Sequence, residues 1–314
     1  MLAQDSPDLT NAKIVVLGSI NMDLIARCHA LPLAGQTLTA SGFQQIRGGK
    51  GANQAVAASL VGSSVRMLGR VGEDGLAASL IDELKQDGVH CSQVLPTPNV
   101  SSGLAMITVS DDAENQIVVI PGANAHVDAA TVDQFADVIS MGDVLLLQLE
   151  IPLPAVLRAK EIAQAAGVRV ILDPAPIPAT PLPADLFEVD LICPNETEAL
   201  EIVGRHAKQN ATAAQPQEIT AWQNVAEQLH QQGSRNVIIT LGKQGVLFFD
   251  GNQHQHLSAQ PVDAIDTTCA GDAFAGALAA KWAATNDLIK AIEFGNQIAA
   301  LSTTATGLTA LRTE

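Results

Sequence analysis

Strand patterns and helix-forming stretches alternate along most of the chain. Strand patterns occur at residues 13–18, 65–71, 144–149, 168–172, 191–193, 236–241 and 246–249. Several of them are continuous apolar runs, which are typical of strands buried on both faces of a parallel sheet. Helix patterns occur at residues 75–86, 152–166, 195–203, 220–232, 272–282 and about 288–303. This repeated strand-then-helix order predicts a parallel sheet covered by helices on both faces. The predicted fold class is α/β, with a three-layer α/β/α (Rossmann-like) main domain.

A further group of segments predicts a small second sheet. Residues 19–25 alternate polar and apolar side chains, as in a strand with one exposed face, and residues 36–46 are another strand candidate. Residues 101–110 and 116–121 predict a hairpin around a polar turn. The chain would leave the main domain twice to build this sheet. We therefore assign residues 11–18, 47–100 and 122–314 to the main domain, and residues 19–46 and 101–121 to a discontinuous β domain.

Three glycines surround Lys50 at the start of an Ala-rich stretch. Glycines let a ligand approach the backbone closely, and the short amide of Asn53 on the first helical turn could reach that ligand. The stretch is not a Walker A motif, because Lys50 is followed by Gly-Ala-Asn and not by Ser or Thr. The alternative is a glycine-rich helix start that serves only packing.

Composition narrows the classes of function. Hydrophobic residues make up 47% of the 314 residues and aromatic residues only 3%, with no Tyr, so the core must be large and aliphatic. The formal net charge of −16 repels phosphate backbones and anionic lipids, so we expect no nucleic acid or membrane partner. An anionic nucleotide would need a metal ion and helix N-termini to bind here.

The cysteines and the N-terminal residues of the chain indicate the cellular compartment. Cys28, Cys91, Cys193 and Cys269 lie far apart and form no CxxC pair, so neither a disulfide framework nor a zinc site is predicted. Residues 1–11 are polar and acidic, unlike a signal peptide. We expect a cytoplasmic protein.

The stretch from Ile265 to Leu278 carries the strongest chemical signal. Small residues, Cys269, Ala270 and Gly271, precede an Ala-rich helix and leave backbone N–H groups bare at its N-terminus, which is a ready anion site. A carboxylate beside such a site, Asp272, could take a proton from a hydroxyl while the N–H groups hold charge on a phosphoryl group. The alternative is that Asp272 only caps the helix.

Other polar residues follow the predicted strands. In parallel sheets, ligands bind beyond the C-terminal ends of the strands. The residues expected at that edge are Glu150, Asp173, Asn195, Glu198, the turn from Thr240 to Gly245, and Asp272. Asn21 and Asp23 share the polar face of the strand at 19–25, which is either a solvated face or a pair of groups that hold substrate hydroxyls.

Taken together, these stretches resemble the ribokinase branch of the ribokinase-like (PfkB) sugar kinase family over nearly the whole chain. The segment Gly48-Gly-Lys-Gly-Ala-Asn-Gln-Ala-Val-Ala57 is similar to the first family signature, and Asp266-Thr-Thr-Cys-Ala-Gly-Asp-Ala-Phe274 is similar to the second. Cys269 stands where the family has Gly or Ala. Shorter similar segments are Gly18–Asp23, Gln148–Glu150, Pro194–Glu198 and Thr240–Gly245.

The resemblance implies a reaction of ATP with D-ribose that gives ADP and D-ribose 5-phosphate. Asp272 would accept the proton of the 5-hydroxyl, and the backbone N–H groups of Cys269, Ala270 and Gly271 would form the anion hole. The resemblance places the sugar against Asn21, Asp23, Gly49, Lys50, Gly51, Ala52, Asn53, Glu150 and Asp272. It places ATP against Asn195, Thr240, Leu241, Gly242, Lys243, Gln244, Gly245, Gly271, Asp272 and Asn296.

The resemblance also implies two metal ions and a partner subunit. A monovalent cation, usually K⁺, would bind to Asp266, Thr268, Ser302, Ala305 and Gly307, although Leu311 stands at a position that is usually Ser. Asn195 and Glu198 would orient Mg²⁺ through water. The small sheet would act as a lid over the sugar and as the contact of a homodimer. The alternatives are a kinase of deoxyribose, fructose or a nucleoside, or a non-catalytic sugar-binding protein on the same fold.

Overall fold

The computed structural model describes residues 9–112, 114–206 and 218–312. The larger sheet has nine strands within this part of the chain. In spatial order they are β13 (His254–Leu257), β12 (Val246–Phe249), β11 (Val237–Thr240), β10 (Leu191–Ile192), β9 (Arg169–Leu172), β8 (Val144–Leu147), β1 (Lys13–Leu17), β4 (Ser64–Gly72) and β5 (His90–Thr97). The strands from β11 to β5 are parallel, and β12 and β13 are antiparallel additions at one edge.

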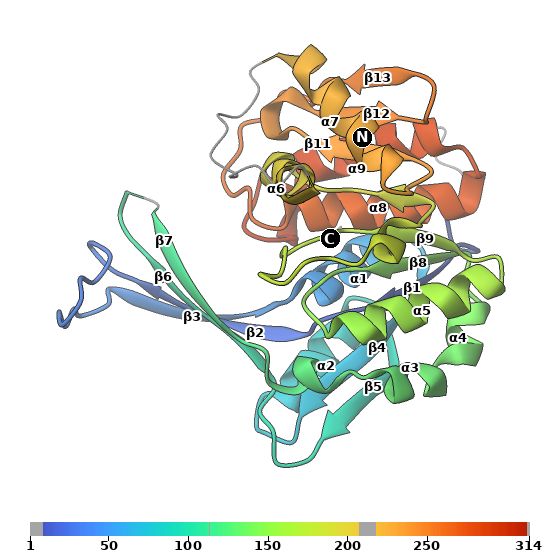
Figure 1. The fold of residues 1–314 in the computed structure, drawn as a ribbon. Coiled ribbons are helices and arrows are strands. Elements are labelled where there is room, and N and C mark those ends of the chain that lie inside the picture. Colours follow the sequence, from blue (N-terminus) through green and yellow to red (C-terminus); the bar gives the residue numbers. More distant parts are fainter. Residues whose placement is uncertain (1–8, 113, 207–217, 313–314) are drawn as a thin grey trace.

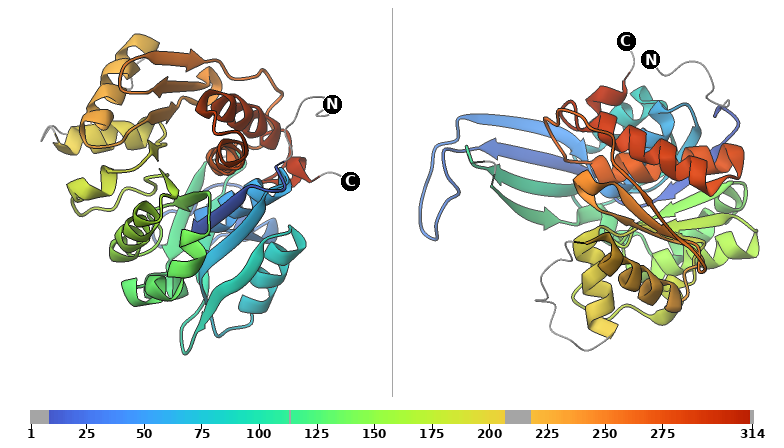
Figure 2. Two further views of the ribbon diagram at one scale, coloured as in Figure 1. Left: turned by 90° about the vertical axis from the view of Figure 1, so that its right-hand side faces the viewer. Right: turned by 90° about the horizontal axis from the view of Figure 1, so that it is seen from above.

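Helices cover both faces of this sheet (Figures 1 and 2). On one face lie α1 (Lys50–Leu60), α2 (Ala77–Gln86), α8 (Ala270–Thr285) and α9 (Leu288–Ser302). On the other lie α3 (Ala129–Gln134), α4 (Ala136–Ser140), α5 (Leu153–Ala165), α6 (Glu196–His206) and α7 (Ile219–Gln231). Short 3₁₀ helices are η1 (Gly122–His126), η2 (Ala184–Phe187), η3 (Gly242–Gln244) and η4 (Thr309–Leu311).

Strand β1 shows why both layers form. Ile14 and Val16 pack into the core under α1 and α8, whereas Val15 and Leu17 pack into the core under α5. Because successive side chains of a strand point to opposite faces, a fully apolar strand needs cover on both sides. The predicted three-layer α/β/α architecture is confirmed. No helix in the described ranges is long and apolar enough to cross a membrane.

A second, four-stranded sheet projects from the main body (Figure 1). Its order is β3 (Gly42–Gly48), β2 (Asn21–Arg27), β6 (Gly103–Val109) and β7 (Asn115–Ile120), with β2 and β6 parallel and the outer pairs antiparallel. The predicted second sheet is therefore present. The strand expected at 36–46 begins only at Gly42, because Gly42 pairs with Arg27, the last residue of β2, and that strand has no further residue for the preceding residues to pair with. The division into two domains remains a prediction.

The strand patterns missed β5 and β13. Both are edge strands of the larger sheet. Strand β5 contains Pro96, which an edge strand tolerates because one of its sides needs no N–H donor. Strand β13 reads His-Gln-His-Leu and has partly exposed side chains, so neither strand shows a continuous apolar run. The polar loop expected at 207–217 lies outside the described residues.

Helix α8 fixes the position of the predicted catalytic stretch. All of its residues from Asp272 to Trp282 are buried. At Gly276 a Cβ atom would lie 2.5 Å from the carbonyl oxygen of Gln54 and 2.8 Å from Cβ of Ala57, so only glycine allows α8 to pack this closely on α1. This close approach brings the first turns of the two helices, and hence the two sequence signatures, together.

Candidate active site

Polar side chains from both sheets converge beyond the C-terminal ends of β8 to β11. Glu150 follows β8, Asp173 follows β9, and Asn195 follows β10, where it forms a bridge to Thr240 at the end of β11. The first turn of α1 faces the same edge, since Lys50 Nζ lies 3.3 Å from Asp173 Oδ2. The predicted convergence of these residues is therefore present in the fold.

Asp272 lies at the centre of this cluster and is only 6% exposed. Its Oδ2 accepts a hydrogen bond from Asn53 Nδ2 (3.1 Å) and its Oδ1 accepts one from Gln54 Nε2 (3.1 Å). Burial raises the pKa of Asp272 to about 6, and Lys50 opposes this rise. A carboxylate with such a pKa is ionised at neutral pH and is still a better proton acceptor than an exposed one.

The N-terminus of α8 is open in front of Asp272. Its N-cap, Cys269, has a left-handed backbone (φ 64°), and a Cβ at the exposed Gly271 would meet nothing within 4 Å. The amide of Ala270 donates to the carbonyl oxygen of Thr267 at 3.3 Å, whereas within the described residues we find no acceptor for the amides of Cys269 and Gly271. These two amides and the positive end of the helix dipole suit an anion.

The thiol of Cys269 belongs to the same turn. Asn53 Nδ2 donates to its Sγ at 3.3 Å as well as to Asp272. Burial, followed by the charges of Asp272 and Asp23, raises the pKa of this thiol. Because the thiolate is the reactive form, Cys269 is a small neutral group at neutral pH.

Lys50 is the cation among these carboxylates. Its backbone N–H donates to Glu150 Oε2 at 3.0 Å, and Glu150 also accepts from Ser19 Oγ. Burial opposes the charge of Lys50, yet Asp173 and then Asp272 raise the pKa of the amine above its usual value. Burial also raises the pKa of Asp173. The cluster therefore has more acids than bases and favours additional cations.

Asn21 and Asp23 enter the site from the base of the second sheet. Asn21 Oδ1 accepts from Asn124 Nδ2 at 2.7 Å. Burial and the nearby Glu150 raise the pKa of Asp23 to about 6. At Gly48 a Cβ atom would lie 2.2 Å from Asp23 Oδ2, so the strand beside Asp23 must carry glycine there. The packing of this sheet against the main domain therefore fixes the positions of the Asn21 and Asp23 side chains.

The predicted nucleotide residues line the other end of the same edge. Asn195 Oδ1 accepts from the backbone N–H of Glu198 (2.9 Å), and Glu198 Oε2 accepts from the backbone N–H of Asn195 (2.8 Å), a reciprocal cap of α6. Burial and then Asp173 raise the pKa of Glu198. The turn from Thr240 to Gly245 contains η3, and Asn296 on α9 donates to the carbonyl oxygen of Ser258 at 2.8 Å.

Asp266 joins the loops that flank α8 and α9. Its Oδ1 accepts from the N–H of Thr268 (2.9 Å) and its Oδ2 accepts from the N–H of Gly307 (3.1 Å). Despite some burial, these hydrogen bonds lower the pKa of Asp266. Two of the predicted K⁺ segments, 266–268 and 302–307, are thus adjacent. Hard oxygen donors of this kind suit K⁺ better than a softer metal, and the described residues contain no His, Cys, Asp and Glu cluster of metal-binding geometry.

Four polar residues that support the site are not among those predicted from the sequence: Ser19, Gln54, Asn124 and Gln148. Gln54 and Gln148 are fully buried. A signal for Gln148 was present, because a Gln in the run Val-Leu-Leu-Leu-Gln-Leu is unusual in a buried strand unless it is hydrogen-bonded. Asn124 had no such signal, because its partner lies more than a hundred residues earlier in the chain.

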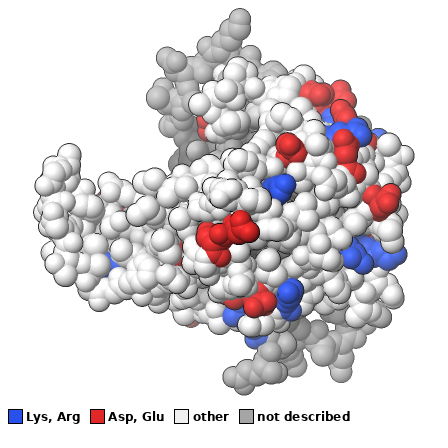
Figure 3. All heavy atoms as spheres, turned by 90° about the horizontal axis from the view of Figure 1, so that it is seen from below, with Lys and Arg blue, Asp and Glu red and all other residues white. Residues whose placement is uncertain are grey.

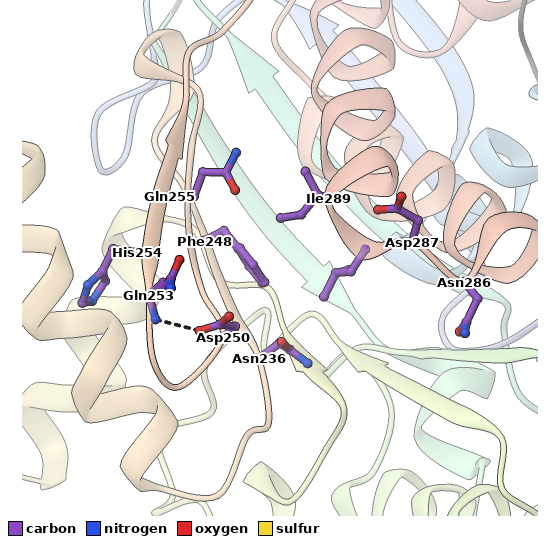
Figure 4. A pocket seen from close by; sticks show the side chains of 10 residues that line it. Asn236, Phe248, Asp250, Gln253, His254, Gln255, Asn286, Asp287 and Ile289 are labelled. Carbon is purple, nitrogen blue, oxygen red and sulfur yellow. Dashed lines mark hydrogen bonds between the residues drawn. The ribbon is translucent and has the colours of Figure 1, made fainter.

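A separate cavity of about 740 Å³ lies between the β12–β13 hairpin and the turn from α8 to α9 (Figure 4). None of its lining residues is a predicted site residue. Its carboxylates serve local structure: Asp250 accepts from the N–H groups of Asn252 and Gln253, and Asp287 caps α9. We therefore place the candidate active site at the carboxylate cluster and not in this cavity.

Comparisons with known proteins find relatives over nearly the whole chain. The model of the pfkB family carbohydrate kinases matches residues 11–314. A ribokinase of Staphylococcus aureus is 37% identical over 297 residues, which cover 94% of each chain. A deoxyribokinase of Salmonella typhi is 36% identical and covers 94% of this chain and 93% of its own. The structure of Arabidopsis thaliana ribokinase complexed with ribose and ATP is similar with a TM-score of 0.86, at 28% identity, over 97% of this chain and all of that one.

Proposed function

Because this chain belongs to the pfkB family of carbohydrate kinases, we propose that it transfers the γ-phosphoryl group of ATP to O5 of D-ribose and releases ADP and D-ribose 5-phosphate. The ribokinases at 37% identity and the structural similarity to a ribokinase complexed with ribose and ATP support this substrate pair. The observation that carries the proposal is the geometry of Asp272, a buried carboxylate held by two amides beside an open helix N-terminus.

Asp272 acts as the base. It takes the proton of the 5-hydroxyl as that oxygen attacks the γ-phosphorus, and the bond to the β,γ-bridging oxygen breaks to leave ADP. The free amides of Cys269 and Gly271 and the dipole of α8 hold the charge on the equatorial phosphoryl oxygens. These donors are already in place before the reaction, because the helix that follows them is buried from Asp272 to Trp282 and holds its open N-terminus in position.

The sugar lies between the two sheets. Asn21, Asp23 and Glu150 supply acceptors and donors for its hydroxyls, and Lys50 supplies a cation. A site built for each hydroxyl rejects a sugar that lacks one, because the matching polar group would lose its partner. The sheet of β2, β3, β6 and β7 closes as a lid and excludes water, which would otherwise compete for the phosphoryl group.

Two cations fit the acidic surroundings. Asn195 and Glu198 would orient Mg²⁺ through water. The charge of the ion would offset the repulsion between the phosphates of ATP and the carboxylates of the site. Asp266, Thr268, Ser302, Ala305 and Gly307 would hold K⁺, whose charge would support the adjacent anion hole. The side-chain oxygens of Asn195, Glu198 and Asp266 keep free lone pairs beside the hydrogen bonds that they accept.

The lid also provides the contact of a homodimer. Phe43, Met106 and Val118 lie on one face of this sheet and are 61%, 53% and 61% exposed. Strands β6 and β7 carry no charged residue, and the projecting sheet shows little charge in Figure 3. Such a face marks an association surface. Val118→Lys is expected to yield a monomer by light scattering, whereas a monomeric parent protein would contradict the dimer.

A coupled assay of ADP release across a sugar panel tests the function. D-ribose is expected to give the highest kcat/KM, with stimulation by K⁺ and a requirement for Mg²⁺. The relationship to the Salmonella typhi deoxyribokinase favours 2-deoxyribose as the second candidate, and fructose and nucleosides complete the panel. The absence of any ADP release that depends on a sugar or a nucleoside would exclude the kinase and leave a non-catalytic sugar-binding protein as the alternative. Location in the cytoplasm remains a prediction.

A further inference from the structure

Gln54 is a fully buried amide that touches both inner carboxylates of the site. From α1, its Nε2 donates to Asp173 Oδ2 at 2.7 Å and to Asp272 Oδ1 at 3.1 Å. A primary amide has two N–H bonds, so each carboxylate receives one. Its Oε1 accepts from Gln148 Nε2 at 2.6 Å. Every strong hydrogen-bonding group of this side chain is therefore committed in one orientation.

The surroundings permit no other orientation of the amide. If the amide rotated by 180°, its oxygen would face two carboxylates and its NH₂ group would face the NH₂ group of Gln148. Gln148 is itself fully buried at the end of β8, and it fits there because residue 18 is glycine: a Cβ on Gly18 would lie 2.0 Å from Gln148 Oε1. Among the described residues, no group donates to that Oε1. An unpaired buried oxygen costs stability, so the fold accepts a cost to keep Gln148 here.

The arrangement separates the two oxygens of Asp272. Oδ1 faces inward to Gln54, and Oδ2 faces Asn53 on the side of the anion hole. Asp173 and Asp272 are like charges near a single amine, Lys50, which lies 3.3 Å from Asp173 Oδ2. Like charges this close favour the protonation of one partner. An amide that donates one hydrogen to each carboxylate counters that tendency without adding charge.

We infer that Gln54, fixed by Gln148, is a positioning residue for the phosphoryl transfer: it turns Oδ2 of Asp272 toward the attacking hydroxyl and keeps that carboxylate ionised at neutral pH. The inference rests on the proposed function, because it assigns to Gln54 a role in the action of Asp272 as a base. Gln54 acts through Asp272 and has no contact with the sugar, so it affects the rate of the transfer more than substrate binding.

The test compares Gln54→Met, which keeps the length and removes the amide, with the parent. We expect kcat to fall by about ten- to a hundredfold, since one charge-assisted hydrogen bond to the base is lost. The KM for ribose is expected to stay within about threefold. The acidic limb of the plot of kcat/KM against pH is expected to move upward by about one pH unit, because the ionised form of Asp272 loses a donor.

Two further variants separate positioning from packing. Gln148→Met leaves Gln54 in place but frees its amide to rotate, so a smaller shift of the acidic limb in the same direction is expected. Ser234→Ala removes another fully buried side-chain hydrogen bond, to the carbonyl oxygen of Phe187, and serves as the matched control with an unchanged limb. If Gln54→Met does not fold, as judged by circular dichroism, Gln148→Met alone decides the question.

The outcomes distinguish this inference from the proposed function. If the parent releases ADP with ribose but the acidic limb stays in place in Gln54→Met and Gln148→Met, the positioning role is overturned, even if kcat falls. If the parent shows no sugar-dependent ADP release at all, the proposed function fails, and the inference fails with it. A shift in both variants, with the limb of Ser234→Ala unchanged, supports the positioning role.

Discussion

The replacement Asp272→Asn tests the electrostatic environment of the site through protein stability. Burial raises the pKa of Asp272 from 3.8 to about 6. Between these values the folded protein keeps a proton that the unfolded chain has released, so this group lowers the free energy of unfolding as the pH rises through the window. The amide of Asn does not titrate and avoids the effect. The variant should therefore gain stability relative to the parent as the pH rises.

The size of this gain follows from the two pKa values. A rise from 3.8 to about 6 corresponds to about 3 kcal/mol at neutral pH, and about 1.4 kcal/mol of it develops between about pH 5 and pH 7.5. The variant also turns an NH₂ group toward Asn53 or Gln54, which costs about 1–3 kcal/mol. That cost is nearly the same at both pH values, so it cancels in the comparison.

The assay is urea unfolding of both proteins at the two pH values, followed by circular dichroism. The free energy of unfolding of Asp272→Asn minus that of the parent is expected to increase by about 1.4 kcal/mol from the lower to the higher pH. A difference that stays constant or decreases would refute the reasoning, because it would mean that folding does not raise the pKa of Asp272. Asp133→Asn, at an exposed carboxylate paired with Arg158, is the matched control.

The geometry of the site also determines how pH, alkylation and K⁺ should affect its activity. Because Asp272 must be ionised to accept a proton and burial raises its pKa to about 6, kcat/KM for ribose should fall as the pH drops below about 6; a flat profile down to about pH 4.5 would contradict this. Alkylation of Cys269 should inhibit but proceed slowly at neutral pH, since burial raises the pKa of the thiol; full activity after complete labelling, followed by mass spectrometry, would refute the inhibition. Asp266→Ala should abolish activation by K⁺ and leave the KM for ribose within about threefold, and a variant that K⁺ still activates would remove Asp266 from the cation site.

The sequence patterns identified the interior of the fold and missed its margins. Central strands such as β8 and β9 are buried on both faces and therefore read as continuous apolar runs. Edge strands β5 and β13 carry polar side chains or a proline, and their pairing depends on neighbours distant in the chain. Pattern alone cannot distinguish such strands from loops.

The residues of the site also fall into two groups, those that sequence motifs predict and those that depend on tertiary packing. Asp272, Lys50 and Asn53 stand in motifs that are continuous in sequence, so their proximity to glycines and helix starts could be recognised. Gln54 stands in the same motif, but its role depends on how closely α1 and α8 pack at Gly276. Asn124 depends on the way the second sheet joins the main domain. Neither arrangement has a local signature.

The most direct test of the account is the turnover of Asp272→Asn with ribose and ATP, measured beside its affinity for ribose by calorimetry. We expect kcat to fall by about 10²–10⁴-fold, the usual contribution of a general base, while the dissociation constant of ribose changes by less than about fivefold. Turnover within about threefold of the parent, with ribose bound normally, would contradict the assignment of the proton transfer to Asp272.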